Sequence, residues 1–282
     1  RPLLCSTGYM ANLAVVTALT DRHDAVFGDK LNHASLIDAA QLSEAKHIRY
    51  THADVEALDA RLSSSTEKDK LVVTDGVFSM DGDVALVPEL IASCQKHNAW
   101  LMVDDAHGLG VLGDGGAGTL QHFSVNNKDV AVVVGTLGKA FGTFGAFVAG
   151  SDALIETLIQ SARSYIYTTA LPVAVAAATR ASLKLIQTRP ELREQLNDNI
   201  QYFRSCAEKA GIEPTESQTA IQPIILGDEQ RAVAASEQLL EKGLLVTAIR
   251  PPTVPKGTAR LRVTLSTSHT KPQIEKLVTA LS

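Results

Sequence analysis

Three features that are missing from this 282-residue chain limit its function. It has no excess of positive charge, because the formal net charge is −5, so the basic surface of a nucleic-acid-binding protein is not expected. It has no apolar run of roughly 18 residues, so no membrane partner is expected. It has only three cysteines and no CxxC pair, which disfavours a disulfide framework or cysteine metal cluster and predicts a reducing, cytoplasmic location.

The composition is that of a globular protein with two domains. Hydrophobic residues make up 45% and charged residues 20%, and the length suits one large domain plus a smaller one. We predict a large domain over 1–180 and a small C-terminal domain over 181–282. The sequence opens at Arg1 without a methionine, so we expect a fragment or a processed chain, and a targeting segment upstream remains open.

The most informative stretch is 130–145, VAVVVGTLGKAFGTFG. The apolar β-branched run Val130–Val134 predicts a buried strand, and it is broken at Gly135. Lys139 follows among glycines, where the backbone is tight and a ligand can approach closely. A lysine in a low-dielectric site loses its proton more easily and becomes the amine nucleophile that a Schiff base requires. On this stretch alone, a solvated lysine in a turn remains the alternative.

Two further apolar strands are predicted to end in polar residues. Leu71–Thr74 precedes Ser79, and Trp100–Val103 precedes Asp104 and His107. In a mostly parallel sheet the carboxyl ends of strands meet at one edge, which is where ligands bind in open α/β sheets. We therefore expect these side chains to lie near Lys139.

Metal binding is the rival interpretation of these strand ends. A divalent cation could be held by the carboxylates and histidine of DDAH at 104–107. The acidic stretch 75–83 could suggest a calcium loop, but it lacks the bidentate glutamate of an EF-hand, which disfavours that site.

A possible anion site precedes the first predicted helix, 11–19. Ser6 or Thr7 can cap this helix, and a turn containing Gly8 at a helix N-terminus is suited to bind phosphate, although a plain capped helix is the alternative. His33 lies just before another predicted helix, where it could equally be a surface or capping residue. A lysine, a carboxylate and a helix N-terminus together are what pyridoxal 5′-phosphate (PLP) requires.

Three motifs carry a resemblance to a known family. VDDAHGLG, GTLGKAFG and IRPPTVPKGTARLR are similar to the α-oxoamine synthases, a family of PLP enzymes, over essentially the whole chain. The resemblance implies an α/β protein, a fold-type I PLP-dependent transferase. Its large domain would hold a mostly parallel sheet, followed by a smaller C-terminal α/β domain. It also implies a homodimer with active sites at the subunit interface.

The resemblance implies a role for each matching residue in binding PLP. Lys139 would form the Schiff base, Asp104 would pair with the pyridinium nitrogen, and His107 and Ser79 would hydrogen-bond near the ring oxygen. His33 would stack on the ring and could donate to a developing enolate oxygen.

Other matching positions are implied to bind phosphate or substrate. Gly8 and Tyr9 would lie at the helix-end turn, with Thr136 on the phosphate side. Tyr167 is expected near the dimer-shared site, and the substrate side would hold Arg250 and Thr253.

Among family members, AIRPPTVPKGT together with AIQP at 220–223 favours the branch that serves biotin synthesis. The implied reaction condenses L-alanine with a pimeloyl thioester, of coenzyme A or an acyl carrier protein, and releases CO₂ and the thiol. The alternatives are another α-oxoamine synthase, using glycine and a different acyl thioester, and a non-catalytic remnant of the fold. The family's N-terminal segment, which carries a substrate arginine, is not among these residues, so we expect PLP binding to survive better than turnover.

Overall fold

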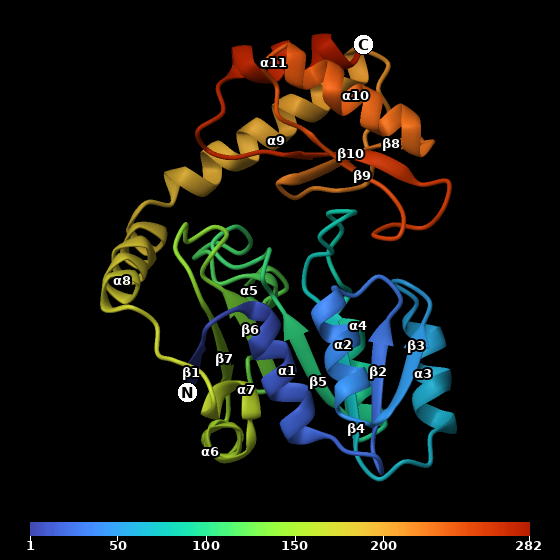
Figure 1. Ribbon diagram of the computed structural model, residues 1–282, viewed down its shortest axis with the longest axis vertical. Coiled ribbons are helices and arrows are strands. Elements are labelled where there is room, and N and C mark those ends of the chain that lie inside the picture. The colour runs from blue at the N-terminus through green and yellow to red at the C-terminus, as the bar shows by residue number, and fades with distance from the viewer. The chain divides into compact units, whose positions relative to one another are not determined.

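The computed structural model describes residues 1–282 and divides them into two compact units (Figure 1). The first unit comprises Arg1–Phe78 and Ala85–Thr188, and the second comprises Ser79–Val84 and Arg189–Ser282. The predicted boundary at 180/181 falls inside helix α8 (Val173–Thr188), because nothing in this Ala-rich sequence stops the helix before Arg189 and Pro190.

The first unit is built on a seven-stranded sheet in the order β1-β7-β6-β5-β4-β2-β3. The pairs β2–β3, β2–β4, β4–β5 and β5–β6 are parallel, whereas β7 is antiparallel to both β6 and β1. The expected mostly parallel sheet is thus confirmed. The strands are β1 (Pro2–Cys5), β2 (Ala25–Asp29), β3 (Lys46–Tyr50), β4 (Lys70–Asp75), β5 (Trp100–Asp104), β6 (Val132–Thr136) and β7 (Ala146–Gly150).

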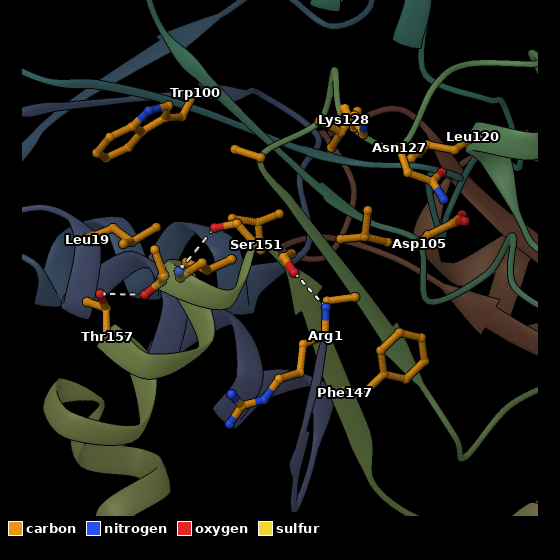
Figure 2. A pocket seen from close by; sticks show the side chains of 18 of the residues that line it. Arg1, Leu19, Trp100, Asp105, Leu120, Asn127, Lys128, Phe147, Ser151 and Thr157 are labelled. Atoms are coloured by element: carbon orange, nitrogen blue, oxygen red, sulfur yellow. Dashed lines mark hydrogen bonds between the residues drawn. The ribbon is translucent and has the colours of Figure 1, made fainter.

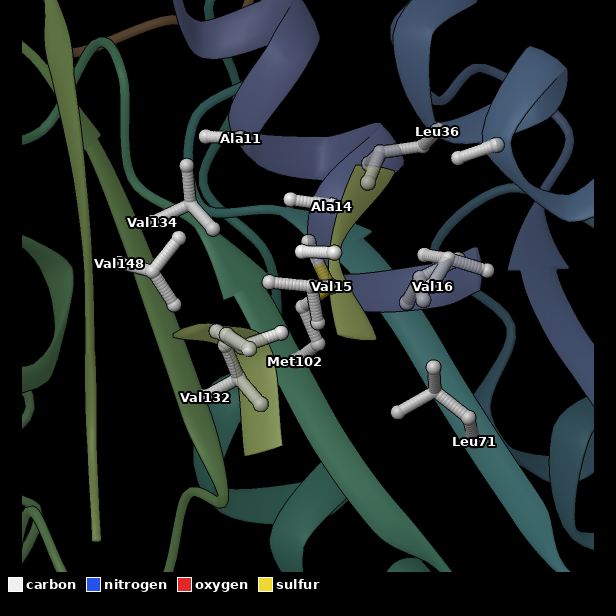
Figure 3. Packing of buried hydrophobic residues seen from close by; sticks show 14 of the residues in the cluster. Ala11, Ala14, Val15, Val16, Leu36, Leu71, Met102, Val132, Val134 and Val148 are labelled. Carbon is white, nitrogen blue, oxygen red and sulfur yellow. The ribbon is translucent and has the colours of Figure 1, made fainter. Parts of the chain in front are cut away.

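Helices cover both faces of this sheet because alternate strand residues point to opposite sides. Val73 and Met102 pack in one hydrophobic core with helices α1, α2 and α6, as Figure 3 shows for part of this cluster. Val72 and Leu101 pack in a second core with α3 and α4. These helices are α1 (Gly8–Leu19), α2 (Ala34–Leu42), α3 (Val55–Ser64), α4 (Val87–Lys96) and α6 (Asp152–Ser161), joined by the short α5 (Thr119–His122) and α7 (Arg163–Ile166).

Side-chain caps fix where several of these helices start. The Thr7 hydroxyl accepts from the Met10 amide at 3.1 Å, and the Asp54 carboxylate accepts from the Ala57 amide at 2.8 Å. Such caps satisfy amide groups that have no partner inside the helix. The Thr7 cap therefore fixes the residue at which α1 begins.

The second unit has a three-stranded antiparallel sheet in the order β8-β10-β9. Helix α10 packs on all three strands, and α11 packs against α9 and α10. Arg262 Nε donates to the Ser79 carbonyl at 2.5 Å, and Arg260 pairs with Asp81, so β10 holds the segment Ser79–Val84. The elements are α9 (Glu191–Lys209), β8 (Ile221–Gly227), α10 (Glu229–Glu241), β9 (Thr247–Ile249), β10 (Ala259–Thr264) and α11 (Lys271–Leu281).

Across both units, none of the helices combines the length and the apolar character needed to cross a membrane.

Candidate functional site

A cavity of about 160 Å³ in the first unit gathers most of the residues that the sequence singles out. It lies where β4, β5 and β6 end and where α1 and α2 begin, as the order of these elements requires. Its lining residues are Gly8, Tyr9, His33, Ser35, Asp75, Asp104, Ala106, His107, Thr136 and Lys139.

Strand register explains why these polar groups meet. Asp75 at the end of β4 pairs with Asp104 at the end of β5, and Asp104 pairs with Val134 of β6. The three strands are parallel, so their carboxyl ends share one edge, as the sequence predicts. Thr136 ends β6 at the same edge.

Asp104 is buried and held by two donors. Asn12 Nδ2 of α1 donates to Asp104 Oδ2 at 2.6 Å, and the Ala106 amide donates to Oδ1 at 3.1 Å. Asp104 is therefore presented to the cavity as a fixed acceptor.

The same asparagine connects Asp104 to His33. Asn12 Nδ2 also donates to Ser35 Oγ at 2.8 Å, and that hydroxyl lies 2.7 Å from His33 Nδ1. The Ser35 amide donates to His33 Nδ1 at 3.2 Å, so this ring nitrogen is an acceptor. A neutral ring accepting at Nδ1 carries its proton on Nε2.

The electrostatic setting of His33 favours that neutral ring. Its pKa is lowered by burial, and the positive charge of Lys139 lowers it further, against the opposing carboxylates of Asp104 and Asp38. A neutral imidazole can hydrogen-bond or stack without adding a charge to the cavity.

Lys139 lies on the turn that follows β6. The Gly142 amide donates to the Lys139 carbonyl at 2.9 Å, and the Leu137 amide donates to the Gly145 carbonyl at 2.8 Å, which closes the turn. Gly142 has a φ of +63°, a conformation that glycine adopts at little cost. Lys139 itself is exposed. The low-dielectric setting expected for this lysine is therefore not provided by this chain's own residues.

The amino end of α1 borders the cavity through Gly8 and Tyr9. A Cβ placed on Gly8 would lie 3.9 Å from Thr136 Cβ, an ordinary contact distance, so the helix start lies beside the end of β6. The Tyr9 hydroxyl donates to Asp38 of α2. The helix dipole and free amides at such an end favour an anion.

These groups fit PLP. A buried carboxylate suits a ring nitrogen, a lysine amine suits an aldehyde, and a helix N-terminus suits a phosphate. Asn12 Oδ1 is buried without a hydrogen-bond partner, so this polar network is incomplete in the protein alone. No group of three or more His, Cys, Asp or Glu side chains is placed to hold a metal ion, which disfavours the rival metal site.

Four predicted site residues lie outside this cavity. Tyr167 is 73% exposed, with the Arg163 guanidinium 5.0 Å from its ring centroid. The second unit holds Ser79, Arg250 and Thr253. The sequence reasoning missed Asn12, Ser35 and Asp75; of these, only Asp75 left a signal, as the last residue before the break after a predicted strand.

A larger cavity of about 940 Å³ lies elsewhere in the first unit. It is lined by Trp100 at the start of β5, by the chain before and within β6, and by Arg1 and Phe147 (Figure 2). Its lining is mainly apolar, and it does not include Lys139, Asp75 or Asp104 of the smaller cavity. We therefore place the candidate site in the smaller cavity.

Comparisons with known proteins show which family the chain belongs to. The model of the aminotransferase class I and II family matches residues 1–281. The 8-amino-7-oxononanoate synthase of Thioalkalivibrio sulfidiphilus is 58% identical over 282 residues, which cover 100% of this chain and 72% of that protein.

Solved structures show the same fold. A serine palmitoyltransferase from S. paucimobilis with bound PLP and myriocin has a TM-score of 0.95 and 35% identity, covering 99% of this chain and 71% of that one. The 8-amino-7-oxononanoate synthase of Francisella tularensis has a TM-score of 0.87 and 35% identity, covering 100% of this chain and 81% of that one. The chain therefore belongs to the aminotransferase class I and II family of PLP-dependent, fold-type I transferases, among the 8-amino-7-oxononanoate synthases.

Proposed function

We propose that this chain is a PLP-dependent acyltransferase that condenses L-alanine with a pimeloyl thioester, with loss of CO₂, to give 8-amino-7-oxononanoate for biotin synthesis. The observation that carries the proposal is the cavity that unites Lys139, Asp104 and His33 in a chain 58% identical to an enzyme of that name.

The reaction requires a carbanion at the alanine Cα. When bound, PLP supplies the electron sink that makes this carbanion accessible. Asp104 would hold a proton on the pyridine nitrogen, and the Asn12 and Ala106 donors orient its carboxylate. The charge of Asp104 therefore sets how well the ring withdraws electrons.

Lys139 has two tasks, both carried out by its amine. It would hold PLP covalently, and the same amine, when free, would take the proton from the alanine Cα. His33, with its proton on Nε2, would stack on the ring and donate to the enolate oxygen that develops during the reaction.

The remaining cavity residues position the cofactor. The amides at Gly8 and Tyr9 and the hydroxyl of Thr136 would bind the phosphate, and His107 would hydrogen-bond near the ring oxygen. Ser79 is proposed to hydrogen-bond near the same ring oxygen.

Substrate binding is assigned to residues outside the cavity. We assign the substrate side to Arg250, Thr253 and Tyr167, with Tyr167 near a site shared between two subunits of a homodimer. The exposed apolar side chains of α8 support a homodimer, because its 16 residues include none that is buried and Val173 is 85% exposed. The chain's three free cysteines are consistent with our proposal of a cytoplasmic location.

The test is an activity screen of the purified chain with PLP, combining L-alanine, glycine or L-serine with acyl thioesters of graded length. We expect the best turnover with L-alanine and a pimeloyl thioester, and none in the matched Lys139→Ala variant. A preference for glycine with another acyl group would assign the chain to a different α-oxoamine synthase. Absence of turnover with every pair would make it a non-catalytic member of the fold.

A further inference from the structure

Asp75 is a buried carboxylic acid for which the mechanism above has no task. It ends β4, is 4% exposed, and lines the cavity beside Lys139. Its register partner on β5 is Asp104. Neighbouring strands lie about 4.8 Å apart and paired residues leave the sheet on the same face, so the two carboxyl groups are side by side.

Too much negative charge would gather here if every acid were ionised. Asp104 on β5 and Asp29 on β2 both act on Asp75, and Tyr50 of β3 also interacts with it. Asp29 is itself 2% exposed. Like charges this close inside a protein are not all ionised, and one of them keeps a proton.

The opposing charge is small. Lys139 is a cation that lowers the pKa of Asp75, but it is exposed, which weakens its field. His33 contacts Asp75 through its backbone amide, and its ring is held neutral. One cation can offset only one negative charge, so Lys139 cannot balance Asp75, Asp104 and Asp29 together.

Hydrogen bonding decides which acid keeps the proton. Asp104 accepts from the Asn12 side chain and the Ala106 amide, whereas Asp75 accepts from the His33 amide at 2.6 Å. Burial beside another carboxyl group with a single backbone donor disfavours the charged form, so Asp75 is the acid that keeps a proton. Consistently, burial and the neighbouring Asp104 raise the pKa of Asp75 well above its usual range.

We propose that Asp75 is a positioning residue that works as a neutral carboxylic acid. One oxygen fixes the His33 backbone at the start of α2, and the retained proton leaves Asp104 as the only charged carboxylate facing the cavity. A single negative charge then matches the single charge of a protonated pyridine ring. The link to PLP rests on the proposed function, whereas the protonation of Asp75 does not.

The first test measures the proton directly. We expect the infrared difference spectrum of the wild-type chain minus Asp75→Asn, at pH 7, to contain the carbonyl band of a protonated carboxylic acid. The matched difference with Asp104→Asn should contain a carboxylate band instead. A carboxylate band for Asp75 would overturn the proposal, whether or not the chain has any activity.

The second test is the pH dependence of unfolding. If Asp75 had only a structural role, replacing it would not alter this pH dependence. An unfolded aspartate has a pKa of about 3.9, so a folded Asp75 that retains its proton loses stability as pH rises from there toward its folded pKa. Relative to Asp75→Asn, the unfolding constant of the wild type should rise up to about tenfold per pH unit over that window. If the ratio of the wild-type unfolding constant to that of Asp75→Asn stayed constant from pH 5 to pH 8, the proposal would be overturned.

The third test separates the two acids by their response to asparagine. Asparagine copies the shape of a neutral carboxylic acid, so Asp75→Asn should bind PLP within about threefold of the wild type. Asp104→Asn removes a charge and should weaken PLP binding by about tenfold or more, which corresponds to about 1.4 kcal/mol or more. Asp75→Ala should weaken it as well, because the His33 amide loses its acceptor. Equal losses in the two asparagine variants would contradict the proposal. If no variant binds PLP, the proposed function fails and the infrared and unfolding results still decide the state of Asp75.

Discussion

At the scale of residues, two consecutive aspartates of one strand end have different tasks. Asp104 faces the cavity, whereas Asp105 is 1% exposed and accepts from the Thr119 amide at 2.7 Å and from its hydroxyl. Strand residues alternate in direction, so neighbours in sequence serve opposite sides of the sheet. Asp104 is thus assigned to chemistry and Asp105 to holding the following loop.

Replacing Asp104 by asparagine should remove the charge opposite the ring nitrogen. Breaking a buried charge pair costs about 3–5 kcal/mol, and a comparable loss in the transition state lowers the rate by roughly 10² to 10³ or more. Exchange of the alanine Cα proton in deuterated water reports this step. Wild-type exchange in Asp104→Asn would contradict the assigned role.

Asp105 should respond to substitution in a different way. In Asp105→Asn the amide can accept from the Thr119 backbone and donate to its hydroxyl, so we expect a mild effect. Asp105→Ala leaves the buried Thr119 amide without a partner, at a cost of about 1–3 kcal/mol in the free energy of unfolding. Urea denaturation of the two variants measures the difference, and equal losses would be inconsistent with this network.

Burial raises the pKa of Asp105 to about 7. This value exceeds that of an unfolded aspartate, about 3.9, so the stability that protonated Asp105 contributes is present below that pH and is lost as pH rises toward 7. The melting temperature of the wild type should therefore fall relative to Asp105→Asn between about pH 4 and pH 7. Parallel curves for the two proteins would argue against a raised pKa.

At the scale of elements, the loop between β5 and α5 is fitted around Asp105. Gly118 has φ +90° and ψ −160°, and a Cβ there would lie 1.9 Å from Asp105 Oδ2. Gly211, after α9, has φ +75°, and no atom lies within 4 Å of the position that a Cβ would take there. Substitution at Gly211 would therefore add backbone strain alone, whereas substitution at Gly118 would add both backbone strain and a steric overlap.

Gly211→Ala should cost only the strain of a left-handed alanine, about 1–2 kcal/mol. Gly118→Ala should cost more, since it adds an overlap with a buried carboxylate to a backbone region that is essentially restricted to glycine. Thermal unfolding of both variants compares the two costs. Equal shifts in melting temperature would show that the loop is not fitted to Asp105.

The sequence predicts strands and helices at this scale better than it predicts their partners. The apolar runs before Asp104 and Lys139 are continuous because those strands are buried on both faces, so they stand out in the sequence. The pairing of β1 with β7, over 140 residues apart, has no local signal. Asp75 left a local signal as the last residue of a predicted strand, but only the register of β4 and β5 identifies Asp104 as its partner.

At the scale of the whole molecule, several large apolar side chains at and just before α8 are exposed to solvent. Tyr167, Val173 and Leu185 are 73%, 85% and 50% exposed, and they lie on or just before α8. Exposed apolar surface of this kind marks an interaction site, which the proposed homodimer would cover.

Val173→Asp should therefore weaken the homodimer, because a charge would be buried at the subunit contact. Leu245→Asp is the matched control, since Leu245 is 86% exposed in the second unit. Sedimentation equilibrium across a range of concentrations should show weaker association for Val173→Asp alone. Unchanged association in both variants would exclude Val173 from the subunit contact.

The central claim is that the cavity holds PLP through Lys139. Borohydride treatment of the chain after incubation with PLP, followed by peptide mapping, tests it most directly. We predict a pyridoxyl group on the peptide that contains Lys139 and no label in Lys139→Ala. Stable labelling of a different lysine, or of none, would contradict the account.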